Sequence, residues 1–358
     1  MSLIFAEGFE NYGVPANDFA SLMERFSSYL TITSNSISLT GTKHSRYFVV
    51  TSYVSSSIYS FQCTVPATNT YYVCFGFYLG TITPTSTNAN FNLLTLYSNN
   101  STSYPQVTVR LNANFQLEWG YGDYTKVSIL NNEKLLMPYS WHNVVIKVVI
   151  SNTVGVFEIY LNGKLINTFT NTNTDPQGTN EVSLVRFFCP FASLAYDNIV
   201  IYNGDGATAF NSYLFPVHPT IRGFQPGTLP VPNDWSGDTT KVNKDTISDG
   251  TYLTTSTNNV NQYAIPSNVS ESLTDFFARD NAKKVHGVTH YTRLYNANWT
   301  KFSIGEKLIG TGQEKVISLS QLKGITFNNI VVSFDVAPDD GAWTVAKAID
   351  TQFSIRRD

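Results

Sequence analysis

The stretch WHNVVIKVVISNTVGVFEIYLNGK, residues 141–164, predicts the fold of the first half of this chain. It contains two apolar runs of strand length, Asn143–Ile150 and Phe157–Leu161, which are separated by polar turn residues. The second run ends at Asn162-Gly163, a pair that favours tight turns. We therefore expect two strands that follow each other closely and a further turn.

Short strands are also expected in most of the first two hundred residues. Tyr59, Phe61, Cys63 and Val65 alternate with polar residues, as in a strand with one buried face. One helix is expected near Asp18–Arg25. Turn residues separate the other expected strands, which lie near residues 71–79, 91–97, 106–111, 115–121 and 183–188. Many short strands that are separated by turn residues predict a β-sandwich.

Two motifs connect this region to a known fold. The hairpin of residues 141–164 is followed downstream by YDNIVIY at Tyr196–Tyr202. This pairing resembles the closing half of a concanavalin-A-like (laminin-G-like) jelly-roll sandwich. The opening IFAEGFENY, residues 4–12, resembles the start of laminin-G-like chains of tailed bacteriophages. The resemblance implies an all-β protein with such a sandwich in residues 1–210.

A second domain is expected after a proline-rich stretch. Residues 211–232 contain Pro216, Pro219, Pro226, Pro230 and Pro232, which is typical of a linker. Residues 233–358 then predict a second, smaller domain of β-sandwich type. Its expected strands are Val285–Leu294, Lys301–Ile304, Ile325–Val336 and Phe353–Arg356, and a helix is expected at Ser267–Ala278.

The order of several segments in the C-terminal part resembles that of tailed-phage structural proteins. The segments are Asp197–Gly206, Phe215-Pro216, Pro232–Trp235, Asp249–Tyr252 and Asp335–Ala346, the last of which precedes a short final helix in those proteins. The resemblance implies a virion component that contacts other virion proteins. Such a protein is made in the cytoplasm of the bacterial host and released by lysis.

Composition and charge narrow the classes of partner. Charged residues make up only 14% of the chain and the net charge is −3, without a Lys/Arg cluster that would fit nucleic acid. No apolar run reaches the roughly 18 residues needed to span a bilayer. The first residues carry Glu7 and Glu10 and lack a basic region, so we expect no secretion signal.

Residues 47–109 contain no Asp, Glu, Lys or Arg. One interpretation is that these strands are buried in the sandwich, with Ser, Thr and Asn on the solvent face. The other is an interface for self-association or docking in a virion, where charges would be costly to desolvate. A homo-oligomer is therefore expected, and both interpretations remain open from the sequence.

The three cysteines, Cys63, Cys74 and Cys189, are expected to be buried thiols. Cys63 and Cys74 lie on adjacent expected strands and could meet. The odd number and the absence of a secretion signal nevertheless favour reduced cysteines.

Catalytic and metal sites are not expected. Glycan hydrolases with this sandwich place alternating carboxylates on one strand, whereas Glu158 stands alone and Asp339-Asp340 falls in a turn. His286 and His290 would lie about 13 Å apart on a strand, too far to share a metal. His142 fits packing or hydrogen bonding better than ligation. The sequence therefore predicts no enzyme and no cofactor, with calcium at Asp123, Asp175 or Asp197 as the alternative.

Aromatic residues near the middle of the chain offer a binding site. Trp119, Tyr121 and Tyr124 cluster in EWGYGDYTK and could stack on sugar rings, unless Trp119 faces the core of a hairpin. The favoured function is a non-enzymatic structural component of a tailed-phage virion, such as a tail, appendage or capsid-decorating protein. The alternative is a receptor-recognition module that binds a glycan of the host surface.

Overall fold

The protein consists of two compact units, residues 1–221 and 222–358, and each is considered by itself. The structure is a computed structural model. It describes residues 2–9, 26, 28–30, 37–42, 45–50, 59–80, 91–112, 116–122, 126–129, 136–189, 194–204, 225–229, 260–267, 285, 288–295, 302–318, 327–334 and 336–357. The helices expected at Asp18–Arg25 and after Ser267 lie outside these residues.

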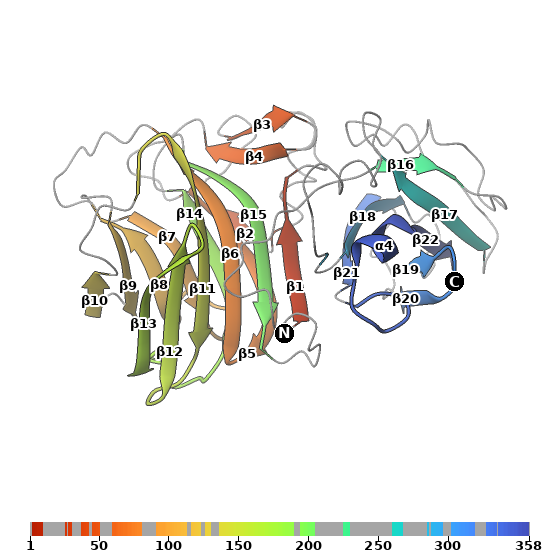
Figure 1. Ribbon diagram of the computed structural model, residues 1–358. Helices are drawn as coiled ribbons and strands as arrows, with labels where there is room; N and C mark the ends of the chain where they lie inside the picture. Colours follow the sequence, from red (N-terminus) through yellow and green to blue (C-terminus); the bar gives the residue numbers. More distant parts are fainter. Residues whose placement is uncertain are drawn as a thin grey trace. The chain divides into compact units, whose positions relative to one another are not determined.

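Unit 1 is a sandwich of two antiparallel sheets (Figure 1). Sheet A contains, in spatial order, β13 (Lys164–Thr172), β12 (Gly155–Leu161), β11 (Ser140–Val149), β6 (Thr70–Leu79), β15 (Leu194–Asn203), β4 (Ser45–Val50) and β3 (Ile37–Thr42), and β1 (Ser2–Glu7) pairs with β15. Sheet B contains β10 (Lys126–Ile129), β9 (Leu117–Tyr121), β8 (Pro105–Leu111), β7 (Phe91–Tyr97), β14 (Val182–Cys189), β5 (Tyr59–Thr68) and β2 (Ser28–Leu30). The expected all-β jelly-roll architecture is confirmed.

The stretch from Trp141 to Lys164 forms β11, β12 and the turn into β13. Val144, Ile146 and Val148 alternate along β11 and are fully buried, which is the pattern of a strand with one core face. Asn162 and Gly163 have φ angles of 51° and 79° and connect the paired residues Leu161 and Lys164. Two successive residues with positive φ are what a two-residue hairpin turn requires, so Asn-Gly suits this position.

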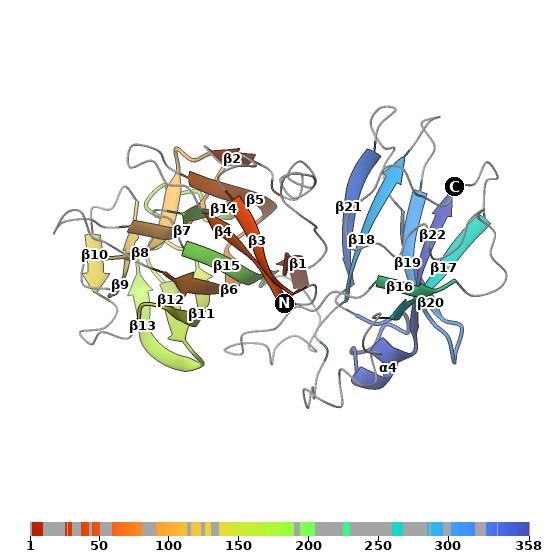
Figure 2. The ribbon, with the colours of Figure 1, turned by 90° about the horizontal axis from the view of Figure 1, so that it is seen from above.

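Aromatic rings fill the space between the two sheets. Across the two sheets, Tyr196 of sheet A contacts Phe61 and Phe187 of sheet B, and Phe75 of sheet A contacts Phe187, with ring centroids 5.6 to 5.7 Å apart. All four side chains are at most 1% exposed. Burial of each such ring contributes about 1.5–3 kcal/mol, so this cluster is a main source of the stability of unit 1. Figure 2 shows the two sheets as separate layers.

Burial accounts for the absence of charge on the described strands between residues 47 and 109. Strands β5–β8 lie inside the two sheets, with partners on both sides, and most of their side chains are buried. A charged side chain at such a position would have to be desolvated. The described strands therefore fit the first of the two interpretations without a second protein.

The three cysteines are buried and free, as expected. Cys63 lies on β5 and Cys74 on β6, but β5 belongs to sheet B and β6 to sheet A. Burial raises the pKa of Cys74 to about 12 and raises that of Cys189 further. These thiols therefore stay protonated and unreactive near neutral pH.

Unit 2 is smaller and also consists of β-strands. One sheet contains β16 (Gln225–Thr228), β17 (Val260–Ser267), β22 (Thr351–Arg357), β19 (Phe302–Leu308) and β20 (Glu314–Ser318), and a second contains β18 (Val288–Tyr295) and β21 (Phe327–Phe334). Ile304 packs with Val332, Phe334 and Trp343, which joins the two sheets. Strand β16 lies within the stretch expected to be a linker, where an edge strand accommodates Pro226.

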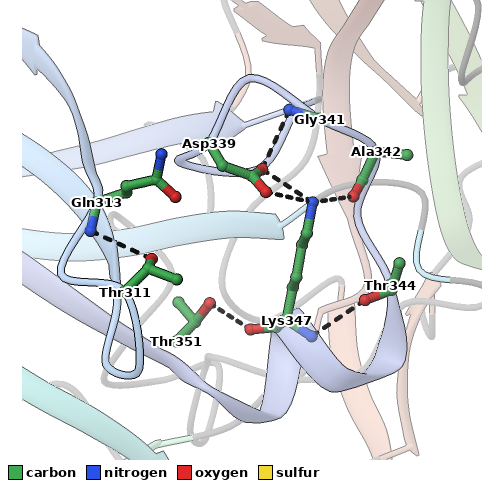
Figure 3. A network of polar contacts seen from close by, with 8 residues as sticks. All are labelled: Thr311, Gln313, Asp339, Gly341, Ala342, Thr344, Lys347 and Thr351. Atoms are coloured by element: carbon green, nitrogen blue, oxygen red, sulfur yellow. Dashed lines mark hydrogen bonds and ion pairs between the residues drawn. The ribbon is translucent and has the colours of Figure 1, made fainter.

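The short final helix expected from the sequence is α4 (Val345–Ile349). Its first turn is capped by Thr344, whose hydroxyl oxygen accepts a hydrogen bond from the Lys347 amide at 3.2 Å. The Lys347 ammonium group contacts Asp339 at 2.7 Å and donates to the Ala342 carbonyl (Figure 3).

Among the described residues no helix is long and apolar enough to cross a bilayer.

A carboxyl group lies in the core of unit 2. Glu306 on β19 is 0% exposed, and in the described part of the chain neither of its carboxyl oxygens has a hydrogen-bond partner. Burial raises the pKa of Glu306 well above its ordinary value. Burial also lowers the pKa of His290, which packs on Phe353, to about 4. The interior of unit 2 therefore disfavours the charged form of both groups.

We expect Glu306→Met to stabilise unit 2 at pH 8. The pKa of Glu306 is higher in the folded protein than its value of 4.5 in the unfolded protein. The folded protein therefore keeps its full stability below pH 4.5, where the carboxyl is protonated in both states, and loses stability as the pH rises. Removing the carboxyl should add about 1–3 kcal/mol to the free energy of unfolding at pH 8 and less at pH 4.5. Calorimetry at both pH values measures this, with Glu306→Gln as the uncharged control. A less stable Glu306→Met protein at pH 8 would show that the carboxylate has a partner.

Candidate functional site

The structure places Trp119 in the core of unit 1. Leu117, Trp119 and Tyr121 alternate along β9 with Glu118 and Gly120, and Trp119 is 3% exposed. Its ring stacks on Phe157 at 4.7 Å, with an angle of 7° between the planes, and lies 4.9 Å from Phe169. This is the core-facing alternative considered for Trp119, and it leaves no free ring face for a sugar.

The other two aromatic candidates are placed differently. Tyr121 is half-buried, with its ring 6.2 Å from that of Trp119. Tyr124 lies outside the described residues. A sugar contact through Tyr121 and Tyr124 therefore stays a prediction.

A second pair of aromatic rings lies on the outer face of sheet A. Trp141 on β11 and Tyr78 on β6 are directly paired, and their ring centroids are 5.7 Å apart. The next residues, His142 and Phe77, point into the core and are 3% and 0% exposed. Because side chains alternate along a strand, Trp141 and Tyr78 point outward, and Trp141 is 40% exposed.

Polar groups occupy the next row of the same face. Asn143 of β11, Gly76 of β6 and Asp197 of β15 are consecutive partners across three strands. The Asn143 side chain is exposed and, among the described residues, forms no hydrogen bond. Gly76 brings no side chain between Asn143 and Asp197. We call Tyr78, Trp141, Asn143 and Asp197 the Trp141 surface.

Hydrogen bonds beneath the Trp141 surface hold its backbone. The amide of Asn143 donates to Asn162 Oδ1 at 2.9 Å, and the amide of Asn162 donates to the Asn143 carbonyl at 2.8 Å. His142 Nε2 lies 3.0 Å from the carbonyl oxygen of Met137, and its Nδ1 lies 3.4 Å from Asn162 Nδ2. His142 is thus a packing and hydrogen-bonding residue, as expected from the sequence.

Charged groups lie farther along the same face. Lys147 forms a 2.9 Å ion pair with Glu158, the acid that stands alone on its strand. Burial, and to a lesser extent the negative charge of Glu158, raises the pKa of the neighbouring Tyr160. Pairing with Lys147 gives Glu158 a structural role in the contact between β11 and β12.

Two of the acids considered for calcium, Asp175 and Asp197, lie within the described residues, and both accept hydrogen bonds from neighbouring residues. Asp175 is 4% exposed and accepts hydrogen bonds from the amides of Thr179 and Asn180 at 3.0 and 2.8 Å. Asp197 accepts hydrogen bonds from the amide and side chain of Asn198, and Asp123 lies outside the described residues. Within the described ranges no group of three or more His, Cys, Asp or Glu side chains is arranged to hold a metal. His286 also lies outside them.

No protein-family model and no curated protein sequence matches this chain. Among solved structures, the alginate lyase Aly36B aligns with a TM-score of 0.41 and 12% identity, over 56% of this chain and 96% of that protein. An endo-β-1,4-glucuronan lyase from the fungus Trichoderma reesei aligns with a TM-score of 0.34 and 14% identity, over 50% of this chain and 91% of that protein. Domain 4 of the arabinanase AbnA from Geobacillus stearothermophilus, solved with arabinotriose, aligns with a TM-score of 0.36 and 16% identity, over 57% of this chain and 93% of that domain. Likenesses at these identities concern the type of fold.

These comparisons correct one expectation from the sequence. We predicted that the chain is not an enzyme because a carboxylate pair on one strand is missing. That prediction is wrong, because the solved structures to which the chain is similar include polysaccharide lyases. The absence of a hydrolase motif does not exclude catalysis for a sandwich of this type.

The two tryptophans of unit 1 should respond differently to truncation. Trp119→Ala should lower the free energy of unfolding by about 3–5 kcal/mol, because it removes a ring packed between the sheets. Trp141→Ala should cost about 1 kcal/mol or less, because its ring lies on the outer face. Thermal unfolding of both variants by calorimetry measures the difference. Equal destabilisation would show that Trp141 is a structural residue and not a ligand contact.

Proposed function

We propose that unit 1 binds glycans through the Trp141 surface. The observation that carries this proposal is an exposed indole ring next to an exposed amide, with a carboxylate two strands away on the same face. Sugar rings have an apolar face of C–H groups and a rim of hydroxyls. A binding site for them needs an aromatic face together with a few placed polar groups.

The Trp141 surface supplies both kinds of contact. The indole of Trp141, supported by Tyr78, offers a flat apolar face. The Asn143 amide can donate to one sugar hydroxyl and accept from another, and the Asp197 carboxylate accepts. All four residues lie on paired strands of one sheet, so little conformational entropy is lost when a ligand binds.

A host-surface glycan is the ligand that the sequence resemblance to phage proteins favours. The proposal extends to a role as a component of a tailed-phage virion, made in the host cytoplasm and released by lysis. Contacts with other virion proteins and homo-oligomerisation belong to the same proposal. It is supported by the order of motifs from Asp197 to Ala346 and by the opening residues 4–12.

The oligomeric part of this proposal has a direct test. Light scattering on the purified protein at two concentrations should give the same mass, equal to a multiple of 39.9 kDa. A mass of one chain at both concentrations would contradict self-association. Glycan binding by a single chain would remain consistent with that result.

Glycan binding should depend on Trp141 more than on other exposed aromatic residues. We expect Trp141→Ala to weaken binding at least about tenfold, which corresponds to about 1.4 kcal/mol. Calorimetric titration with purified surface polysaccharides of bacteria, arabino-oligosaccharides and alginate oligosaccharides measures this. Tyr104→Ala is the matched control, because Tyr104 is 41% exposed and lies outside the Trp141 surface.

The outcomes of this experiment separate the hypotheses. Binding that is lost in Trp141→Ala and Asn143→Ala but kept in Tyr104→Ala supports the proposal. Equal affinity in all variants, or no binding to any of these glycans, contradicts it. The length of the glycan chains after incubation distinguishes binding alone from binding with cleavage.

A further inference from the structure

Tyr139 has a backbone conformation that bulky residues rarely adopt. It lies in the turn that precedes β11 and has a φ angle of 60°. Pro138 comes directly before it, and a proline followed by a residue with positive φ is typical of a type II turn. The third residue of such a turn is usually Gly or Asn, because a larger side chain brings Cβ too close to the following carbonyl oxygen. Tyr139 therefore holds this conformation at a cost in stability.

Other described residues with positive φ show why this tyrosine is unusual. Apart from Phe9 and Tyr139, those that are not glycine are all Asn or Asp, whose short polar side chains tolerate the conformation. Phe9 is 0% exposed and its ring lies 5.6 Å from that of Phe48, so burial offsets the cost at this position. Tyr139 is 64% exposed, and burial offsets little of its cost. Strain that packing does not explain points to a function of the exposed ring.

The turn that carries Tyr139 is anchored to the sandwich. The Tyr139 amide donates to the Leu79 carbonyl at 2.5 Å, which connects the turn to the end of β6. His142 Nε2 lies 3.0 Å from the carbonyl oxygen of Met137 and 3.2 Å from its amide nitrogen. Leu136, at the start of the turn, is 4% exposed. The backbone of Tyr139 is therefore held before a ligand arrives, which reduces the entropy lost on binding.

Tyr139 lies close to the Trp141 surface. It precedes Trp141 by two residues, and two residues of chain span at most about 7 Å. The side chain of Met137, two residues earlier, is 68% exposed. Accessible apolar groups thus extend from Trp141 along the turn, and a ligand longer than one sugar ring can contact both aromatic residues.

We propose that Tyr139 is a second stacking platform of the glycan site, so that the ligand is an oligosaccharide chain and not a single sugar. Tyrosine offers a flat apolar ring for the C–H face of a sugar and a hydroxyl for its rim. It also has few rotatable bonds, so little freedom is lost when it is ordered by a ligand. The inference rests on the proposed function, because Tyr139 is a sugar contact only if glycans bind at Trp141.

Tyr139→Gly separates a binding role from a structural one, because the two roles predict opposite changes in stability. Gly adopts positive φ freely, so we expect this variant to raise the midpoint of thermal unfolding by about 2–4 °C. The same variant should weaken the binding of alginate or arabino-oligosaccharides at least about tenfold. Calorimetry measures both quantities. Tyr139→Phe, which keeps the ring, should retain most of the affinity, and the matched control Tyr104→Ala should leave it unchanged.

The length of the ligand gives a second test. The unaltered protein should bind oligosaccharides more tightly than the monosaccharides of the same series, and Tyr139→Gly should remove this difference. Equal affinity of the unaltered protein for all lengths, or unchanged oligosaccharide affinity in Tyr139→Gly, overturns the inference. A lower unfolding midpoint of Tyr139→Gly also overturns it, because the tyrosine would then serve the fold.

The variants at Tyr139 and Trp141 distinguish failure of this inference from failure of the proposed function. Oligosaccharide binding that needs Trp141 but not Tyr139 removes the second platform and keeps the Trp141 surface. Binding that is unchanged in Trp141→Ala contradicts the proposed function, whatever the result for Tyr139→Gly.

Discussion

The packing of Tyr196 between the two sheets is the constraint on which the Trp141 surface depends. Tyr196 belongs to β15 of sheet A, and its hydroxyl lies 3.1 and 2.6 Å from the carbonyl oxygens of Leu93 and Phe188 in sheet B. Burial raises its pKa well above the ordinary value, so the hydroxyl stays a donor. The contact fixes the closing strand against the opposite sheet. A shift of one residue in β15 would turn Tyr196 outward and lose this contact.

The outer faces follow from the core by alternation. With Tyr196 inward, Asp197 points outward beside Gly76. Phe77 and His142 are buried, which turns Tyr78 and Trp141 outward. The same rings that stabilise the sandwich thus present an aromatic and amide surface on sheet A. Unit 2 adds a carboxyl group buried at Glu306.

The sequence predicts where strands and turns lie better than it predicts which residues become neighbours on adjacent strands. Alternation and turn residues predict the hairpin from Trp141 to Lys164. The odd number of cysteines predicts free thiols, and the short final helix is expected from the resemblance of Asp335–Ala346 to a segment of phage proteins. Alternation from Val144, Ile146 and Val148 also places Trp141 and Asn143 on the outer face. Leu117 similarly places Trp119 in the core. The row of Asn143, Gly76 and Asp197 depends on the register of three strands distant in sequence, which no local pattern contains. The burial of Glu306 in a strand likewise depends on the opposing sheet.

The central claim is that a glycan ring stacks on Trp141 and not on Trp119. The most direct measurement is the indole N–H signals of the protein in a two-dimensional NMR spectrum during a glycan titration, with Trp141→Phe to assign the signal. The account predicts that the Trp141 signal shifts as the glycan saturates, whereas the Trp119 signal, from a ring packed on Phe157, stays in place. A Trp141 signal that does not move while the glycan binds would contradict it.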